Sequence, residues 1–529
     1  MIGAMFEAIK GRVSGRQLLA LLLLVALLAR VAGARWGLPL LLHPDENKLI
    51  DPALRMLDSG SAHPGGFLYP SFYIYAQAAV AGLLRGLSAL GGRAAPEMAD
   101  YYWWGRVLTA ALGTATLALA WACARAAGAR AWSLLAAALV AVSVLHLGQS
   151  MLITTDMPAT LWVSACLLAC LRVARGHDAV RDYLLAGAMA GLAAGSKYNG
   201  GLVALALVAV HLSRGFSLAA LFDRRLLAGG AAAVGAFLVS TPFALVEPGE
   251  LWRFLVLQSD AYNQHPGAGT GAATSYAAYW ATLLRKFGGP QLLLAGIGAA
   301  ALCMRAGSTA AVLGGFPLLY FAFMGAYPVH FERNAVVLLP ALGALAAVGA
   351  ATAWQASAKP GGARGAMLLR SLLLLVLVAG AWQQASRSAA HLRLARLPDT
   401  RLLAMNWMQQ NLPRRSTVAL EHYTPPLAAG RLWPTRLGYG GLARSGGLAG
   451  FDYLVASSGD YGRFVNHPER YPEQAAAYQR VFASNELVKV FRPDWRSSNG
   501  PEIRVYLTPA GSRRTERRLR RRSSPPSAP

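Results

Sequence analysis

Two adjacent carboxylates follow the first long apolar run of the chain. The segment His43-Pro44-Asp45-Glu46 lies just past the run at 18–34. Charged side chains are costly near hydrocarbon, so a carboxylate pair there indicates function more often than a pair on a soluble surface. A carboxylate held at the interface can serve as general base toward a hydroxyl group. A helix start, with Pro early and acids in the first turn, explains the same residues structurally and is compatible with that chemistry.

A second acid, Asp156, lies between two apolar runs in the segment TTDMP at 154–158. A helix N-cap followed by proline two residues later explains this residue structurally. The topology derived below places Asp156 on the same side of the membrane as Asp45, which favours a functional role. Two separated carboxylates can hold an acceptor, bind a metal ion, or divide the roles of base and orienting group.

Two cations at the ends of apolar runs are candidates for binding a phosphate. Lys197 lies in the segment GSKYNG at 195–200, a tight turn between two runs. It can snorkel to the interface or act as a point charge toward a lipid phosphate. Arg333, in the segment HFERN at 330–334, begins a run on the side that disfavours positive charge. Arg333 is the better phosphate clamp of the chain's arginines, because a guanidinium can bind phosphate bidentately.

Aromatic and histidine side chains complete the candidate set. Tyr69 and Tyr73 bracket the motif YPSFY. An aromatic belt at the membrane interface explains them, and rings beside a carboxylate would also suit stacking on a sugar. His330 begins the HFERN segment, and His265 lies in a long loop. A lone histidine is more often structural than a ligand.

These residues need a membrane scaffold to position them. The chain has 529 residues, of which 55% are hydrophobic and 14% charged, with a mean hydropathy of +0.37. Apolar runs recur, each long enough to cross roughly 30 Å of hydrocarbon. We expect eleven membrane-spanning helices, near 18–34, 104–124, 131–151, 157–173, 181–196, 200–213, 225–243, 289–306, 308–327, 335–354 and 366–384.

Charge orients these spans. With a cytoplasmic N-terminus, five basic turns fall on the cytoplasmic side, as the positive-inside rule requires. The run at 72–90 is apolar enough to cross, but a crossing would move all five turns outward. We therefore expect 72–90 to lie in the interface, within one outer loop at 35–103. The candidate residues above then converge on the outer face.

From about residue 385 the composition becomes that of a soluble domain. The runs at 416–420 and 453–456 predict strands, and 399–411 predicts an amphipathic helix. We expect a small α/β domain at 385–511 on the outer side. The Arg-, Ser- and Pro-rich tail at 512–529 should be disordered.

Composition and motifs also exclude function classes. The net charge of +25 comes from Arg in short loops and in the tail, which fits anionic lipid rather than nucleic acid. The sequence has no P-loop, no Gly-x-Gly-x-x-Gly fingerprint after a strand and no Gly-x-Ser-x-Gly elbow. Nucleotide-dependent chemistry is therefore not indicated, and a donor that arrives through the lipid would need no nucleotide site.

Two rival functions stay open at this point. A secondary transporter would place ionisable residues near the bilayer midplane on broken helices, whereas the acids here cluster at outer ends. A structural or lipid-binding membrane protein would act through its outer domain.

The motifs HPDE, YPSFY, TTDMP, GSKYNG and HFERN together resemble the polyprenyl-phosphate-sugar-dependent glycosyltransferases with the GT-C fold. More narrowly, the chain resembles the bacterial branch related to protein O-mannosyltransferases and lipid A aminoarabinose transferases, over about residues 17–510. The resemblance implies a GT-C-like catalytic domain at 1–384 in the bacterial inner membrane. It implies inverting transfer of a sugar from polyprenyl phosphate to a protein, lipid or glycan acceptor on the extracytoplasmic face.

The resemblance also implies roles for single residues. The family's first-loop acid matches Asp45, expected to be the base, and its second outer acid matches Asp156, with Glu46 in support. Its phosphate-binding cations match Lys197 and Arg333. The expected substrate contacts are Tyr69, Tyr73, His265 and His330.

Metal dependence and sugar identity stay open. Some relatives use a divalent cation, and the candidate ligands here are Asp45, Glu46, Asp156 and His265. The stretch GGFLYP at 65–70 departs from the aminoarabinose enzymes because it contains no Lys. The sugar that the resemblance would suggest is therefore in doubt.

Overall fold

The computed structural model describes residues 14–264, 272–358, 362–438, 440–444 and 448–514. The chain divides into two compact units. The first comprises Met1–Arg35, Asp45–His265 and Ala272–Leu392, and the second comprises Trp36–Pro44, Pro266–Gly271 and Arg393–Pro529. The second unit begins later than the expected boundary at 385, because a long helix continues to Leu394 after the composition has become polar.

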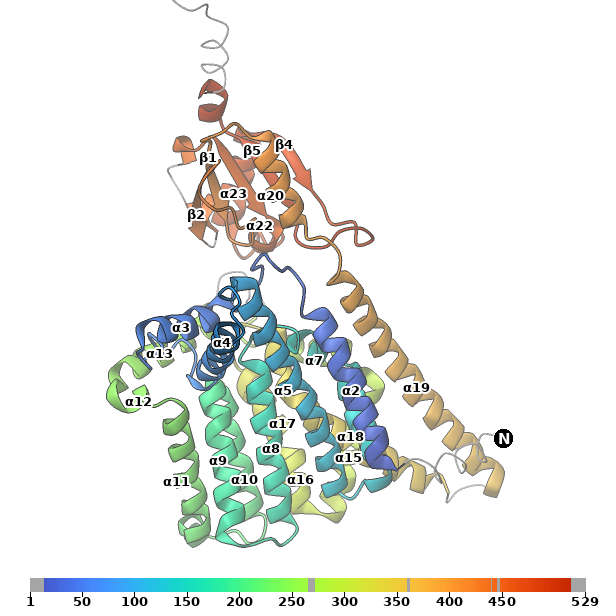
Figure 1. Cartoon of the computed structure of the whole chain (residues 1–529). Coiled ribbons are helices and arrows are strands. Elements are labelled where there is room, and N and C mark those ends of the chain that lie inside the picture. The colour runs from blue at the N-terminus through green and yellow to red at the C-terminus, as the bar shows by residue number, and fades with distance from the viewer. Residues whose placement is uncertain (1–13, 265–271, 359–361, 439, 445–447, 515–529) are drawn as a thin grey trace, which may run out of the picture. The chain divides into compact units, whose positions relative to one another are not determined.

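The first unit is a bundle of long helices (Figure 1). Its elements are α2 (Gly15–Gly33), α3 (Asn47–Ser59), α4 (Phe72–Leu90), α5 (Met98–Ala126), η1 (Arg130–Trp132), α6 (Ser133–Val142), α7 (Val144–Gln149), α8 (Asp156–Ala174), α9 (Val180–Ser196), η2 (Tyr198–Val203), α10 (Ala204–Leu212), η3 (Leu218–Phe222), α11 (Arg224–Ser240), α12 (Phe243–Val246), α13 (Pro248–Gln264), α14 (Tyr276–Lys286), α15 (Gly289–Arg305), α16 (Gly307–Leu313), α17 (Gly315–Gly325), η4 (Glu332–Leu338), α18 (Leu339–Ala356) and α19 (Gly362–Leu394).

A multi-pass membrane protein is confirmed, but the count of eleven spans is not. Helical segments occupy every expected span. In the described part of the chain, six helices are long and apolar enough to cross, or seven if the pair α14 and α15, bent by 108°, counts as one. The remaining expected spans are short or broken helices.

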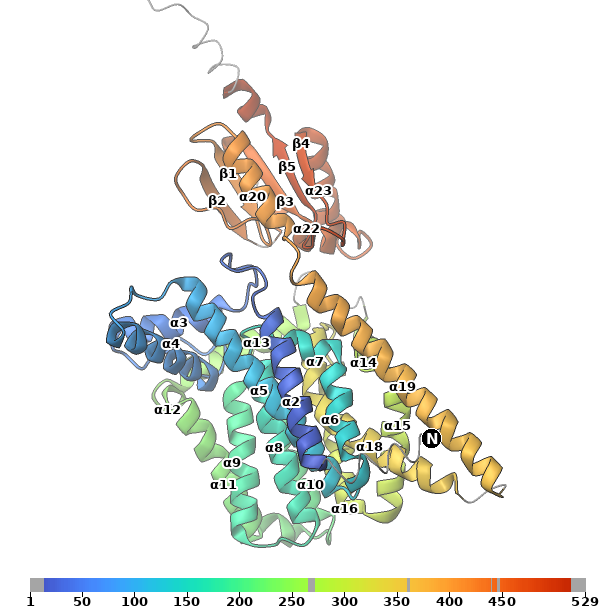
Figure 2. The ribbon, with the colours of Figure 1, turned by 45° about the vertical axis from the view of Figure 1, so that its right-hand side comes forward.

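The helix α4 coincides with the run at 72–90, for which we expected an interfacial position. It is not among the helices that meet the length and composition of a span. In Figure 1 and Figure 2, α3 and α4 lie crosswise to the long helices at one end of the bundle. This orientation agrees with a helix that lies along a membrane surface.

Glycines allow α9 and α11 to pack at very short range. A Cβ atom at Gly187 would lie 1.9 Å from the carbonyl oxygen of Gly229, and one at Gly191 would lie 2.1 Å from that of Ala233. These glycines and Gly195 recur every four residues along one face of α9. Small residues at such spacing let helix backbones approach closely in membranes.

Side chains satisfy carbonyl groups that two helix breaks expose. The Ser143 hydroxyl, between α6 and α7, donates to the Lys286 carbonyl oxygen at 2.9 Å. From α19, Ser388 donates to the Val142 carbonyl oxygen at 2.7 Å and Gln384 to that of Arg285 at 3.2 Å. Freed backbone groups inside a membrane protein need such partners.

The second unit contains a five-stranded sheet in the order β2-β1-β3-β5-β4. Its strands are β1 (Thr417–Glu421), β2 (Trp433–Gly438), β3 (Tyr453–Ser457), β4 (Glu486–Phe491) and β5 (Ile503–Leu507). Strands β2, β1 and β3 pair in parallel, with Val418 opposite both Pro434 and Tyr453, and β5 pairs antiparallel with β3 and β4.

Helices cover both faces of this sheet. The helix α20 (Thr400–Asn411) packs on one face through Ala404 and Met408. The helices α22 (Ser458–Val465) and α23 (Pro472–Ser484) pack on the other, where Phe464 and Tyr478 join the core. Two short helical turns, α21 (Gly441–Arg444) and η5 (Leu448–Gly450), complete the unit. The expected small α/β domain, including both strands and the helix that the sequence predicted, is confirmed.

Candidate active site

The turn before α3 holds Asp45 against two cations. The Lys48 ammonium donates to Asp45 Oδ1 at 3.0 Å, and the Arg333 guanidinium donates to Asp45 Oδ2. The side chains of Asp45 and Arg333 are 15% and 30% exposed, so both are shielded but reachable. Asp45 and Arg333, which are 288 positions apart in the sequence, thus belong to one polar cluster.

Glu46, beside Asp45, has a different environment. Both Glu46 and Arg106 of α5 have fully buried side chains. Arg106 Nε and Nη2 donate to the Glu46 carboxylate at 2.7 and 2.6 Å, and the backbone N–H of Ile153 donates to it at 2.9 Å. Glu46 therefore connects the turn that carries Asp45 both to α5 and to the segment that leads to Asp156.

Asp156 and Lys197 form a second ion pair. Lys197 Nζ donates to Asp156 Oδ1 at 2.7 Å and to the Asn334 side-chain oxygen at 2.7 Å. Asp156 is the first residue of α8, and the N-cap residue Thr155 makes no side-chain cap. The two structural alternatives, an N-cap aspartate and a snorkelling lysine, thus do not account for these side chains.

Asn334, Tyr262 and Tyr279 belong to this cluster although sequence reasoning gave them no role. The Asn334 amide nitrogen donates to the hydroxyl oxygens of Tyr279 at 3.0 Å and Tyr262 at 3.2 Å. The position of Asn334 next to Arg333 was the one available signal. Arg106 left a clearer one, since it is an arginine inside an expected span and so needs a partner.

The four expected substrate contacts have different positions. Tyr69 is half-buried near Asp45, Arg333 and Asp156, and burial together with the Asp45 charge raises its pKa. Tyr73 is fully buried, and its hydroxyl bonds Thr109 of α5. The structure thus places Tyr73 in the packing between α4 and α5, where a substrate cannot touch it.

His330 is connected to the cluster through Tyr279, which bonds Asn334. Its Nε2 lies 3.1 Å from the Thr282 hydroxyl oxygen, and its ring packs edge-on at 4.5 Å from the ring of Tyr279. Burial lowers the pKa of His330. His265, the remaining expected contact, lies outside the described residues.

The described residues do not fit a metal site. Among them, no three His, Cys, Asp or Glu side chains gather closely enough to hold an ion. Glu46 is engaged by Arg106, and Asp45 and Asp156 each face a cation.

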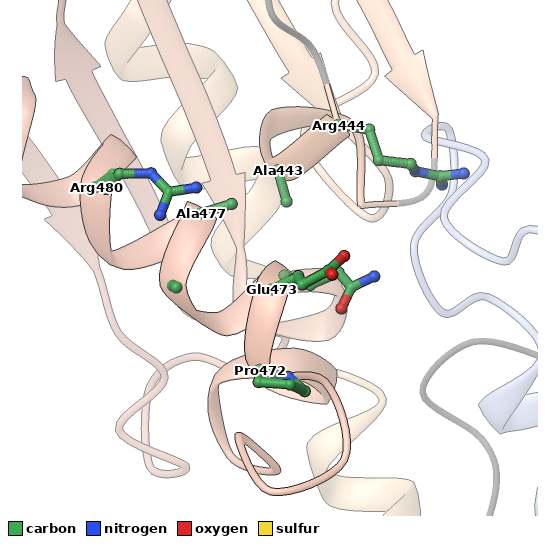
Figure 3. Close-up of a pocket in the computed structure, with 8 residues that line it drawn as sticks. Ala443, Arg444, Pro472, Glu473, Ala477 and Arg480 are labelled. Carbon is green, nitrogen blue, oxygen red and sulfur yellow. The ribbon is translucent and has the colours of Figure 1, made fainter.

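The second unit has a groove of its own (Figure 3). It measures about 640 Å³ and lies between α21 and α23. None of the residues proposed above for chemistry lines it. Its lining is Ala443, Arg444, Pro472, Glu473, Gln474, Ala476, Ala477 and Arg480.

Comparison with known proteins connects part of the sequence to a family. Residues 99–245 match the family model described as dolichyl-phosphate-mannose-protein mannosyltransferase. This region contains Asp156 and Lys197 but neither Asp45 nor Arg333. No curated protein matches the sequence.

Solved structures share the fold over most of the chain. ArnT from Cupriavidus metallidurans bound to undecaprenyl phosphate has a TM-score of 0.51 and 17% identity, covering 93% of this chain and 98% of ArnT. The Archaeoglobus fulgidus oligosaccharyltransferase in the apo form has a TM-score of 0.53 and 13% identity, covering 86% of this chain and 72% of that one. The chain therefore has the GT-C fold. In its family match and its fold, the chain is similar to membrane glycosyltransferases of the GT-C class.

Proposed function

We propose that this protein transfers a sugar from a polyprenyl-phosphate carrier to an acceptor on the extracytoplasmic face of a bacterial inner membrane. The observation that carries the proposal is the cluster of two carboxylate–cation pairs, Asp45 with Arg333 and Asp156 with Lys197. The mannosyltransferase family match and the fold shared with ArnT, solved with undecaprenyl phosphate, support the donor class. No observation favours a transporter or a purely lipid-binding protein.

The proposed chemistry is a single inverting displacement. An acceptor hydroxyl or amine attacks the anomeric carbon from the face opposite the phosphate, and Asp45 takes the proton that the acceptor loses. The bond from the anomeric carbon to the phosphate oxygen breaks, and polyprenyl phosphate leaves with the electron pair. That leaving group needs no proton near neutral pH, so one base and phosphate-binding cations suffice.

The remaining side chains have supporting roles in this proposal. Arg333 is 30% exposed, and among the described residues its hydrogen bond goes to Asp45, so it has N–H groups left for a phosphate. Lys197 adds a second positive charge and holds Asp156 in place. Among the described aromatic residues, Tyr69 is the one that we propose contacts the sugar. Glu46 fixes the turn that carries Asp45.

For the membrane topology we propose eleven spans, a cytoplasmic N-terminus and an extracytoplasmic second unit. The basic turns of the sequence support this orientation through the positive-inside rule. A reporter that works only in the cytoplasm should therefore be active when it is fused at residue 214 or 360. A reporter that works only outside the cytoplasm should be active when it is fused after residue 511.

The first test removes the proposed base. We expect Asp45→Asn to reduce product formation by at least about a hundredfold, the usual range for a general base, while the protein still folds and binds undecaprenyl phosphate. The measurement is mass spectrometry of envelope glycans and glycoproteins from a deletion strain complemented with each variant. Asp58→Asn is the matched control, because Asp58 is exposed and its ion pair is with Arg85 rather than with a residue of the cluster. Full product formation by a folded Asp45→Asn protein would falsify the assignment of the base.

A further inference from the structure

We propose that Asn334 is a positioning residue that directs the Lys197 ammonium toward the carrier phosphate. This inference rests on the proposed function, because it concerns the same phosphate. Its basis is the hydrogen-bond geometry of an amide that the reaction itself does not use.

Within the described part of the chain, Lys197 has one donor left for a ligand. An ammonium group carries three N–H donors in tetrahedral directions. Two of them are taken, one by Asp156 at 2.7 Å and one by the Asn334 side-chain oxygen at 2.7 Å. With two directions fixed, the third N–H can rotate little, and the Lys197 side chain is 15% exposed. The positions of Asp156 and Asn334 together therefore set where an anion can be bound.

The orientation of the Asn334 amide is itself determined. Lysine can only donate, so the amide atom that faces it must be the oxygen. The amide nitrogen then faces the hydroxyl oxygens of Tyr279 and Tyr262, at 3.0 and 3.2 Å. Asn334 is 1% exposed. If the amide turned over, its N–H group would face the N–H donors of Lys197. The tyrosines of α13 and α14 also hold the amide of η4 in its orientation.

A neutral amide also keeps the charge of the cluster suitable for an anion. The charges of Asp45 and Asp156 are outweighed by those of Lys48, Arg333 and Lys197. An aspartate at position 334 would have nearly the same shape and would still accept from Lys197, but it would add a third negative charge. That carboxylate would oppose a phosphate at the same ammonium. Asparagine supplies the acceptor without the charge.

The test is Asn334→Asp in the full-length protein in lipid nanodiscs, with undecaprenyl phosphate as the probe. We expect its affinity at pH 8 to be about tenfold weaker than that of the unmodified protein, the scale of one added charge a few ångströms away. The ratio of the two affinities should stay below one from pH 8 to pH 6, where the new carboxylate and Lys197 are both charged. Taking the ratio at each pH removes the titration of the lipid phosphate itself. Asn334→Leu, which has nearly the same size but accepts no hydrogen bond, should also weaken binding, because the third Lys197 N–H is then no longer directed. If Asn334 does not position Lys197, Asn334→Leu should bind like the unmodified protein.

Asn263→Asp is the matched control. Asn263 lies on α13, is exposed, and bonds the Ser259 carbonyl oxygen rather than Lys197. It should leave the affinity unchanged at every pH. Equal affinity of Asn334→Asp and the unmodified protein at pH 8, or an equal loss in Asn263→Asp, would overturn the inference. Failure of the unmodified protein to bind undecaprenyl phosphate would instead overturn the proposed function.

Discussion

Asp45 and Glu46 are neighbours in sequence with opposite surroundings. Asp45 is partly exposed and touches the flexible ends of Lys48 and Arg333. Glu46 has no exposed surface, and its oxygens accept from Arg106 and Ile153. A carboxylate with every oxygen engaged and no access cannot take a proton from a substrate. The two acids thus divide into one that faces the reaction and one that holds its neighbour in position.

Removing one partner of the Glu46–Arg106 pair should destabilise the protein strongly. A buried charge left without its partner costs about 3–5 kcal/mol. We expect Glu46→Gln and Arg106→Gln each to lower the thermal unfolding temperature in detergent. The double variant should lose clearly less than the sum of the two, because it leaves no unpaired charge. Additive losses would mean that the pair is not coupled.

For single residues, the sequence predicts which residue types belong to the site better than it predicts which residues pair with each other. Asp45, Asp156, Lys197 and Arg333 stand out because charge near an apolar run is rare. Their pairing does not follow from the sequence, since Arg333 and Asp45 are 288 positions apart. For Tyr73 the sequence does not predict the surroundings of the side chain. A tyrosine in such a motif has the same sequence pattern whether it faces a substrate or Thr109.

Among the elements, α9 and α11 depend on the absence of side chains at their contact. Gly191 has no room for a Cβ atom, which would meet the Ala233 carbonyl oxygen at 2.1 Å. Gly230, in the middle of α11, has nothing within 4 Å of such an atom. Both glycines lie inside helices, so they differ in surroundings and not in backbone conformation.

We therefore expect Gly191→Val to separate α9 from α11 and Gly230→Val to be tolerated. Overpacking typically costs about 1–3 kcal/mol, and here the clash is with backbone. The measurement is the thermal unfolding temperature of each variant in the same detergent. Valine has the same helix propensity at both positions, so equal shifts would show that the close approach contributes nothing.

Hydropathy finds helices but not their breaks. The expected run at 157–173 became α8 (Asp156–Ala174), and 72–90 became α4, nearly residue for residue. The run at 131–151 instead breaks at Ser143 into α6 and α7. The break is supported by Ser143, Ser388 and their carbonyl partners, which come from distant segments. A local pattern carries no information on such partners.

In the whole molecule, the second unit carries its own buried acids. Burial raises the pKa of Asp460 to about 7, against backbone N–H bonds from Gly440 that lower it. Burial and the Asp460 charge raise the pKa of Glu421 well above its usual range, and the Tyr478 hydroxyl donates to Glu421. The protonated form of both acids is therefore the one that stabilises the folded unit.

The stability of this unit should fall as pH rises. An aspartate in the unfolded chain has a pKa near 3.9, so the folded unit binds the proton more tightly. The stabilisation is complete below about pH 4 and is lost as pH rises through about 7. Hydrogen exchange of the full chain at pH 5.5 and 8, corrected for intrinsic rates, should show weaker protection of β1 and α22 at pH 8. Asp460→Asn should flatten this dependence, and stronger protection at pH 8 would contradict it.

The Asp45–Arg333 contact has a consequence for kinetics. As long as the two side chains hold each other, the Arg333 guanidinium competes with an acceptor hydroxyl for Asp45 Oδ2. If Arg333 turns to a carrier phosphate, the same movement releases that oxygen. Binding of sugar donor before acceptor would then be favoured, an order visible in steady-state inhibition patterns. An acceptor that arrived first would meet a base still engaged by Arg333, so hydroxyl groups that have no sugar to receive would be deprotonated more slowly.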